Sequence, residues 1–245
     1  MNRAVAVVRR EWASLYGPVR AALVARGWRA IPLTLVSTGL IVLFQTLHSR
    51  SWGRGFVQDI GFVRAEDPLW LALVRTPASL FVPALSLPAW GSVAQVLLVF
   101  GVAEIVLGRP RTVLAAYVCT LAGTLYARLG IAIGPGGALG LPASYQQIVD
   151  TGPSASVVGL ALCVCVSRRA WFTAVLLVAA VVAEVIVKAN LAGKEHLVAI
   201  VTAAALCALA ALWRRRPSAG GDGDGGGDGD GGGGADRSGV TPAGN

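Results

Sequence analysis

Six apolar runs, each close to the length of a membrane-spanning helix, dominate this 245-residue chain. A helix rises about 1.5 Å per residue, so roughly 20 apolar residues cross a hydrocarbon core of about 30 Å. The runs cover residues 31–48, 85–107, 112–133, 152–166, 170–187 and 197–213. They predict an all-α polytopic membrane protein whose six transmembrane helices form one bundle.

Composition agrees with lipid as the surrounding solvent. Charged residues make up 14% of the chain, whereas a soluble domain carries about a quarter. The formal net charge of +8 comes almost entirely from arginine. A basic balance can indicate nucleic-acid binding. Here the arginines flank the apolar runs, so they indicate membrane topology, and we expect no nucleic acid as a partner.

The distribution of basic residues predicts the orientation. Segments 1–30, 108–111, 167–169 and 214–216 carry thirteen basic residues, against six in the segments between the other run ends. Loops on the cytoplasmic side carry the excess of Lys and Arg. We therefore predict a multi-pass protein of the cell membrane with both termini cytoplasmic. An odd number of spans would place 214–216 outside.

Three regions follow from this pattern: a basic N-terminal segment 1–30, a membrane domain 31–213 and a tail 214–245. Apolar residues recur at helical spacing in segment 1–30, which fits an interfacial helix on an anionic leaflet. The simpler alternative is that its arginines only mark the cytoplasmic side. The Gly/Asp-rich tail cannot bury apolar area, so disorder is predicted. The connection 49–84 is too polar to span, and its amphipathic piece 68–81 fits the outer interface.

The four cysteines all lie inside apolar runs, where Cys behaves as a small hydrophobe. The spacing of Cys163 and Cys165 is not that of a zinc site, and no second pair completes one. We expect no disulfide, metal or other cofactor.

Ser154 and His196 are the candidate catalytic residues. Ser154 opens the fourth run and His196 opens the sixth, and these two runs cross in the same direction. The topology therefore predicts similar depth on the same side. A serine becomes a nucleophile when a base lies within hydrogen-bond reach. The alternative is structural, because serine joins helices in membranes and histidine often lies at the interface.

Other charged residues flank this pair. Asp150 and Glu195 fit either carboxylates that orient His196 or loop charges in water, and the second interpretation is preferred. Arg128 and Glu184 lie near the outer ends of the third and fifth runs, where they can pair with each other or extend toward the interface.

Several elements occur in an order that resembles the rhomboid family of intramembrane serine proteases, in particular divergent rhomboid-like proteins of actinobacterial type. They are Glu104-x-x-x-Gly108, then Arg111 and Tyr117, then Asp150-x-Gly152-x-Ser154, and finally His196-Leu-x-Ala. The resemblance covers about residues 31–213. It implies a six-span fold with Ser154 as the nucleophile and His196 as the general base. Glu104 would be structural, with Arg109 or Arg111 as its partner.

The resemblance has departures. Pro88 and Ser92 stand where the family has a His-x-x-x-Asn element that holds the oxyanion, and Ala155 and Glu195 replace small residues of the pattern. Two functions therefore stay open. One is an intramembrane serine endopeptidase acting on single-span membrane proteins. The other is an inactive rhomboid-like protein that binds or retains membrane helices as clients. A small transporter or lipid-handling protein is a third alternative, which lacks the ionisable residues at mid-membrane depth that it would need.

Overall fold

The computed structural model describes residues 3–82, 88–137, 139–188 and 190–215, and in these ranges the chain is all-α. Its nine described α-helices are joined by connections that range from single residues to the long segment between α6 and α7. They are α1 Arg3–Arg26, α2 Pro32–Ser49, α3 Ser51–Gly61, α4 Leu69–Ser79, α5 Ala89–Leu107, α6 Arg109–Ile133, α7 Ser154–Arg168, α8 Trp171–Val187 and α9 Leu191–Arg215. Short 3-10 turns occupy Gly27–Ala30 and Ala143–Gln147. The tail expected to be disordered lies outside the described residues, apart from its first two, which end α9.

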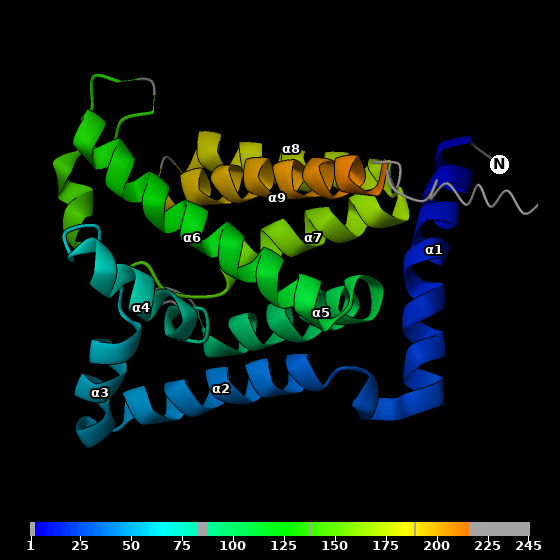
Figure 1. Cartoon of the computed structure of the whole chain (residues 1–245), viewed down its shortest axis with the longest axis horizontal. Coiled ribbons are helices and arrows are strands. Elements are labelled where there is room, and N and C mark those ends of the chain that lie inside the picture. Colours follow the sequence, from blue (N-terminus) through cyan, green and yellow to red (C-terminus); the bar gives the residue numbers. More distant parts are fainter. Residues whose placement is uncertain (1–2, 83–87, 138, 189, 216–245) are drawn as a thin grey trace, which may run out of the picture.

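Six helices, α2 and α5 to α9, run side by side in alternating directions (Figure 1). Helix α1 crosses one end of this bundle, and α3 and α4 lie at the opposite end. We call these the α1 end and the α4 end. Helices α2, α6 and α8 begin at the α1 end, whereas α5, α7 and α9 begin at the α4 end.

Four of the six helices are long and apolar enough to cross a membrane: Pro32–Ser49, Trp90–Leu107, Arg109–Ile133 and Leu191–Arg214. The apolar helices α7 and α8 are shorter, with 15 and 17 residues. At 1.5 Å per residue α7 measures about 22 Å, less than the hydrocarbon core. The prediction of a multi-span all-α protein is thus confirmed in outline, and the two short helices are the difference from it.

The starts of two helices differ from prediction. Helix α9 begins at Leu191, because the Asn190 side chain accepts a hydrogen bond from the Gly193 N–H (3.0 Å) and caps the helix earlier than hydropathy indicates. His196 therefore lies in the second turn of α9 and not at its opening. The predicted start of the second run, residue 85, lies outside the described residues, and α5 is described from Ala89.

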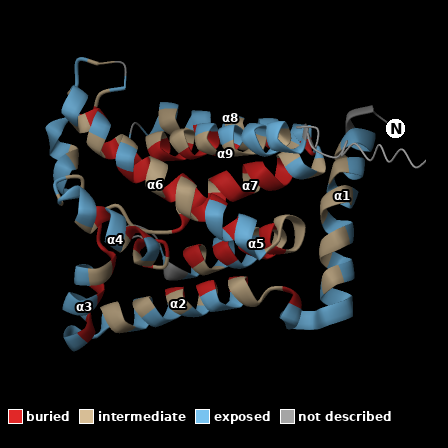
Figure 2. Cartoon of the chain, viewed as in Figure 1, coloured by how far each residue is buried: buried red, intermediate tan, exposed pale blue. Residues whose placement is uncertain are grey.

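Helix α7 forms the centre of the bundle and is its most buried helix (Figure 2). It packs on α5, α6 and α9. A Cβ atom at Gly159 would collide with Cys119 Sγ, so only glycine allows this approach of α7 to α6. Ala199 and Ala203, both fully buried, face the same core from α9. Small residues thus allow α7 and α9 to approach closely.

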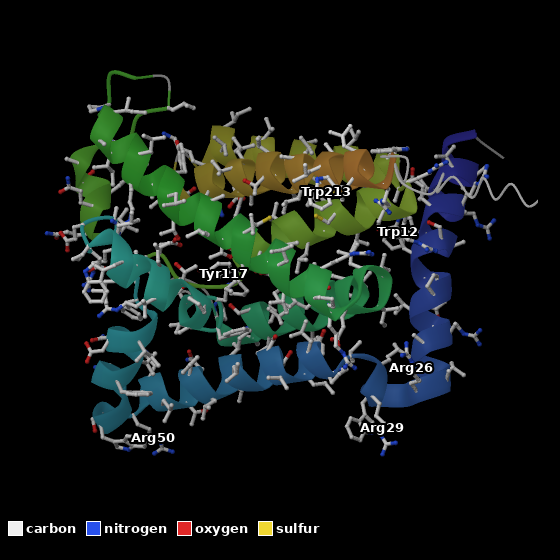
Figure 3. The ribbon with its side chains drawn as sticks, viewed as in Figure 1. Trp12, Arg26, Arg29, Arg50, Tyr117 and Trp213 are labelled. Atoms are coloured by element: carbon white, nitrogen blue, oxygen red, sulfur yellow. The ribbon has the colours of Figure 1, made fainter. Side chains whose placement is uncertain are left out.

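All seven tryptophans of the chain are exposed, each by at least 57%. Trp12, Trp28, Trp171 and Trp213 gather toward the α1 end, on α1, in the turn after it, at the start of α8 and near the end of α9; Trp52, Trp70 and Trp90 belong to helix starts at the α4 end. Arg29 and Arg50 flank α2 at opposite ends (Figure 3). Tryptophan prefers the two membrane–water interfaces. The two groups of tryptophans fit a bilayer around the candidate membrane-spanning helices.

Helix α1 is docked on the bundle by polar contacts. The Glu11 carboxylate accepts hydrogen bonds from the N–H groups of Phe172 (2.9 Å) and Thr173 (3.1 Å) at the start of α8. These hydrogen bonds lower the pKa of Glu11, because they stabilise its ionised form, and the bond from Phe172 has the largest effect. The Arg168 guanidinium donates to the Ser14 carbonyl (2.6 Å and 3.0 Å). The predicted helix in segment 1–30 is thus present, and its contact with lipid stays a prediction.

Glu104 joins α5 to the start of α2. Its buried carboxylate accepts hydrogen bonds from the N–H groups of Leu33 (3.0 Å) and Thr34 (2.8 Å) and from Thr34 Oγ1 (2.9 Å). Arg109 Nε donates to Glu104 Oε1 (3.1 Å), the same oxygen that accepts from the Leu33 N–H. The first N–H groups of a helix have no partner within the helix, and a carboxylate satisfies them well. The structural role predicted for Glu104 is confirmed, with Arg109 as its partner.

Replacing Glu104 should therefore destabilise the fold. We expect Glu104→Ala to lower the free energy of unfolding by about 3 kcal/mol, because it leaves two buried N–H groups without an acceptor. Titration with a denaturing detergent in mixed micelles would measure this. Glu66→Ala, at an exposed position, is the control. Equal stability of the two variants would contradict the capping role.

Candidate active site

Ser154 and His196 lie at the same end of two packed helices, as predicted. Ser154 is the first residue of α7, and His196 lies in the second turn of α9; both helices begin at the α4 end. Ser154 is half-buried, and no hydrogen bond of its hydroxyl is found among the described residues. Ser156 differs, because it is fully buried and donates to the Pro153 carbonyl (2.6 Å). Ser154 is thus the serine of this turn with a free hydroxyl.

The His196 side chain is held through one ring nitrogen. His196 is 9% exposed, and its Nδ1 lies 2.9 Å from Glu184 Oε2. Its Nε2 is buried and has no hydrogen-bond partner in the described part of the chain. No hydrogen bond joins Ser154 to His196 within the described ranges. The structure brings the two residues to one end of the bundle, with no hydrogen bond between them.

Glu184 is the residue that sequence reasoning assigned differently. It was expected to pair with Arg128 or to extend toward the interface, yet it pairs with His196, and Arg128 Nη2 instead donates to the Arg64 carbonyl (3.0 Å). Only residues 188–190 separate α8 from α9, so α9 runs back alongside α8. A residue near the end of α8 then lies close to the first turns of α9, although the rotation of the two helices decides whether it faces them. That hairpin geometry was the available signal.

Two further acids lie near His196, and neither is a freely solvated loop charge. Glu195 is 6% exposed, and its Oε1 is buried without a partner among the described residues. Asp150 is half-buried and accepts a hydrogen bond from Thr124 Oγ1 (3.2 Å). The expectation of charges in water is therefore wrong for Glu195 and incomplete for Asp150. The reason is that α9 begins before Glu195 and carries it into the bundle against Gly123 of α6.

The segment before α7 is fastened to the α3–α4 region. The Asp150 N–H donates to the Val63 carbonyl (2.8 Å), and the Gly152 N–H donates to the Ser79 carbonyl (3.0 Å). These two hydrogen bonds hold the α3–α4 region against the segment that leads into α7. Burial raises the pKa of Asp150, and the Thr124 hydrogen bond and the neighbouring His196 oppose that rise.

The positions that depart from the family pattern lie on α5. Ser92 is buried in the first turn of α5, and Pro88 precedes the helix at its N-cap position. Proline has no N–H to donate, and Ser92 has no hydrogen bond in the described structure. Helix α5 packs on α7, so both positions belong to the helix beside Ser154.

Comparisons with known proteins give no further guidance: no model of a protein family, no curated protein and no solved structure matches this chain. The described side chains also contain no group of three or more His, Cys, Asp or Glu residues arranged to hold a metal ion. The four cysteines are free, and three of them are buried.

The raised pKa of Asp150 predicts a pH effect on stability. Between the ordinary Asp value of about 3.9 and the raised folded-state pKa, the folded protein binds more protons than the unfolded chain. Stability should therefore fall as the pH rises through this interval. The loss of stability caused by ionising Asp150 is absent below the ordinary Asp pKa and complete above the raised folded-state pKa.

Thermal unfolding in detergent across this pH range would measure the slope. We expect the melting temperature of Asp150→Asn, which cannot ionise at this position, to depend less on pH than that of the wild type. Asp59→Asn, on the exposed side of α3, serves as the control and should keep the wild-type slope. A wild-type slope in Asp150→Asn would show that other groups cause it.

Proposed function

We propose that this chain is a rhomboid-like intramembrane serine endopeptidase with six spans and both termini in the cytoplasm, acting on single-span membrane proteins. One observation carries the proposal. The buried Nε2 of His196 has no partner, and α9 packs on the helix that begins with the free hydroxyl of Ser154. A base with an open nitrogen and a serine with an open hydroxyl at one end of two adjacent helices are the elements of a Ser–His pair.

The short α7 supports a site below the membrane surface. Helices α7 and α8 complete six spans because they are apolar and lie alongside the four longer ones. A helix of about 22 Å does not reach both surfaces of a core of about 30 Å. Its first residue, Ser154, is then recessed at the α4 end, where water enters from that side only. The arginines near the α1 end favour that end as cytoplasmic.

The chemistry follows from the roles of the two side chains. Ser154 Oγ attacks the scissile carbonyl carbon while His196 Nε2 accepts its proton. The N–H groups in the first turn of α7 have no partner within the helix, so they can donate to the developing oxyanion. His196 then protonates the leaving amine, and water hydrolyses the acyl-enzyme. Contact between Ser154 and His196 must form in the substrate complex, as catalytic hydrogen bonds in free enzymes are often long.

A second function is favoured by different observations. Pro88 cannot donate to an oxyanion, Ser92 is buried, and no hydrogen bond joins Ser154 to His196 within the described ranges. Loss of one oxyanion donor costs about 10²–10³ in rate. An inactive rhomboid-like protein would use the same end of the bundle to bind or retain membrane helices without cutting them.

A fluorophosphonate probe distinguishes the two functions, because it forms a covalent bond only with an activated serine. We expect labelling of the wild type in liposomes and its loss, by at least about 10²-fold in rate, in Ser154→Ala and His196→Ala. Ser156→Ala should still be labelled, since Ser156 is buried and bonded to Pro153. Absence of labelling in a folded wild type would favour the binding function. Loss of labelling in Ser156→Ala alone would show that Ser156, and not Ser154, is the nucleophile.

A further inference from the structure

The Glu184–His196 contact decides which nitrogen of the imidazole carries the proton. An ionised carboxylate only accepts hydrogen bonds, so at 2.9 Å it requires a proton on Nδ1. A neutral imidazole then has its lone pair on Nε2, the nitrogen that is buried and unpartnered. Without such a partner the proton distributes over both nitrogens, and the form with Nε2 protonated cannot act as a base there.

Glu184 is the one acid placed to do this among the described side chains around the ring. Glu195 precedes His196 on the same helix, yet no hydrogen bond joins it to the imidazole. Asp150 interacts with His196 electrostatically, and its own hydrogen bond comes from Thr124. Glu184 comes from α8, so the orienting group and the base belong to different helices.

We infer that Glu184 is a positioning residue that fixes His196 in the tautomer with Nδ1 protonated and so keeps Nε2 free to take the Ser154 proton. The inference rests on the proposed serine chemistry for its catalytic part and on the contact alone for the tautomer. It extends the Ser154–His196 pair to a third member contributed by the neighbouring helix. The geometry is that of an acid that orients the base without contacting the substrate.

A purely structural role for the contact is the competing explanation, since Glu184 also joins α8 to α9. Glu184→Gln separates the two. The amide has the same size and can still form a hydrogen bond across the two helices, but it can accept from Nδ1 or donate to it. It therefore keeps the link between helices and loses control of the tautomer.

The chain offers a clean spectroscopic readout, because His48 and His196 are its only histidines. In a His48→Gln background, nitrogen-15 NMR of labelled imidazole at alkaline pH reports which nitrogen is protonated. We expect the Nδ1-protonated form with Glu184 present and a mixture containing the Nε2-protonated form in Glu184→Gln and Glu184→Ala. The matched control is Glu195→Gln, the neighbouring buried acid, which should leave the tautomer unchanged.

Probe labelling of the same proteins tests the catalytic part. We expect Glu184→Gln to label at least about 10²-fold more slowly than its parent while unfolding at the same temperature. An unchanged tautomer in Glu184→Gln, or wild-type labelling, would overturn the inference. Failure of the parent to label, with the tautomer still dependent on Glu184, would overturn the proposed function alone and leave Glu184 as the residue that orients His196.

Discussion

Hydrocarbon offers no hydrogen bonds, so the unpaired N–H groups at the start of a membrane helix need acceptors from the protein or from the interface. Two helices that begin at the α1 end receive them from other helices. Glu104 of α5 caps α2, and Glu11 of α1 caps α8. The residues at their own N-cap positions, Ile31 and Ala170, have no side-chain oxygen to offer. The arrangement of α1, α2, α5 and α8 depends on these two carboxylates.

A glutamate side chain forms a polar contact near each end of α8. Glu11 holds its start, and Glu184 bonds His196 near its end. Between these points α8 buries only Ala174 and Val181 and exposes most of its apolar surface (Figure 2). Helix α8 thus combines polar contacts at its two ends with one apolar stripe toward the core, while α7 is buried along its length. The orientation of the His196 ring, which Glu184 contacts, therefore depends on the position of α8.

Hydropathy predicted the existence and order of the membrane helices, because burial in lipid requires long apolar runs regardless of tertiary detail. The Glu104–Arg109 pair was also predictable, since the two residues are five apart and flank the break at Gly108 between α5 and α6. Helix α3 was not predicted. Its sequence contains Gly53, Gly55 and Gly61, which disfavour a helix, and packing of Val57 in a small core with Phe62 and Val82 overrides that preference.

The common end of Ser154 and His196 was predictable, and their hydrogen-bond partners were not. Equal depth for Ser154 and His196 follows from helix direction alone. The partner of His196 does not, because it depends on how α8 and α9 rotate about their axes, and that is set by packing. The burial of Glu195 was missed for a related reason: hydropathy places a helix start where charges end, whereas Asn190 starts α9 before Lys194 and Glu195.

The two capping carboxylates differ in when they become available during synthesis. Glu104 follows Thr34 by 70 residues, so α2 enters the membrane before its cap exists, and water or lipid head groups must serve its first N–H groups until α5 is made. Glu11 precedes Thr173 by 162 residues and is ready when α8 emerges. The first span is therefore completed by a later one, and a chain that stops before residue 104 carries an open helix start that a full-length chain closes.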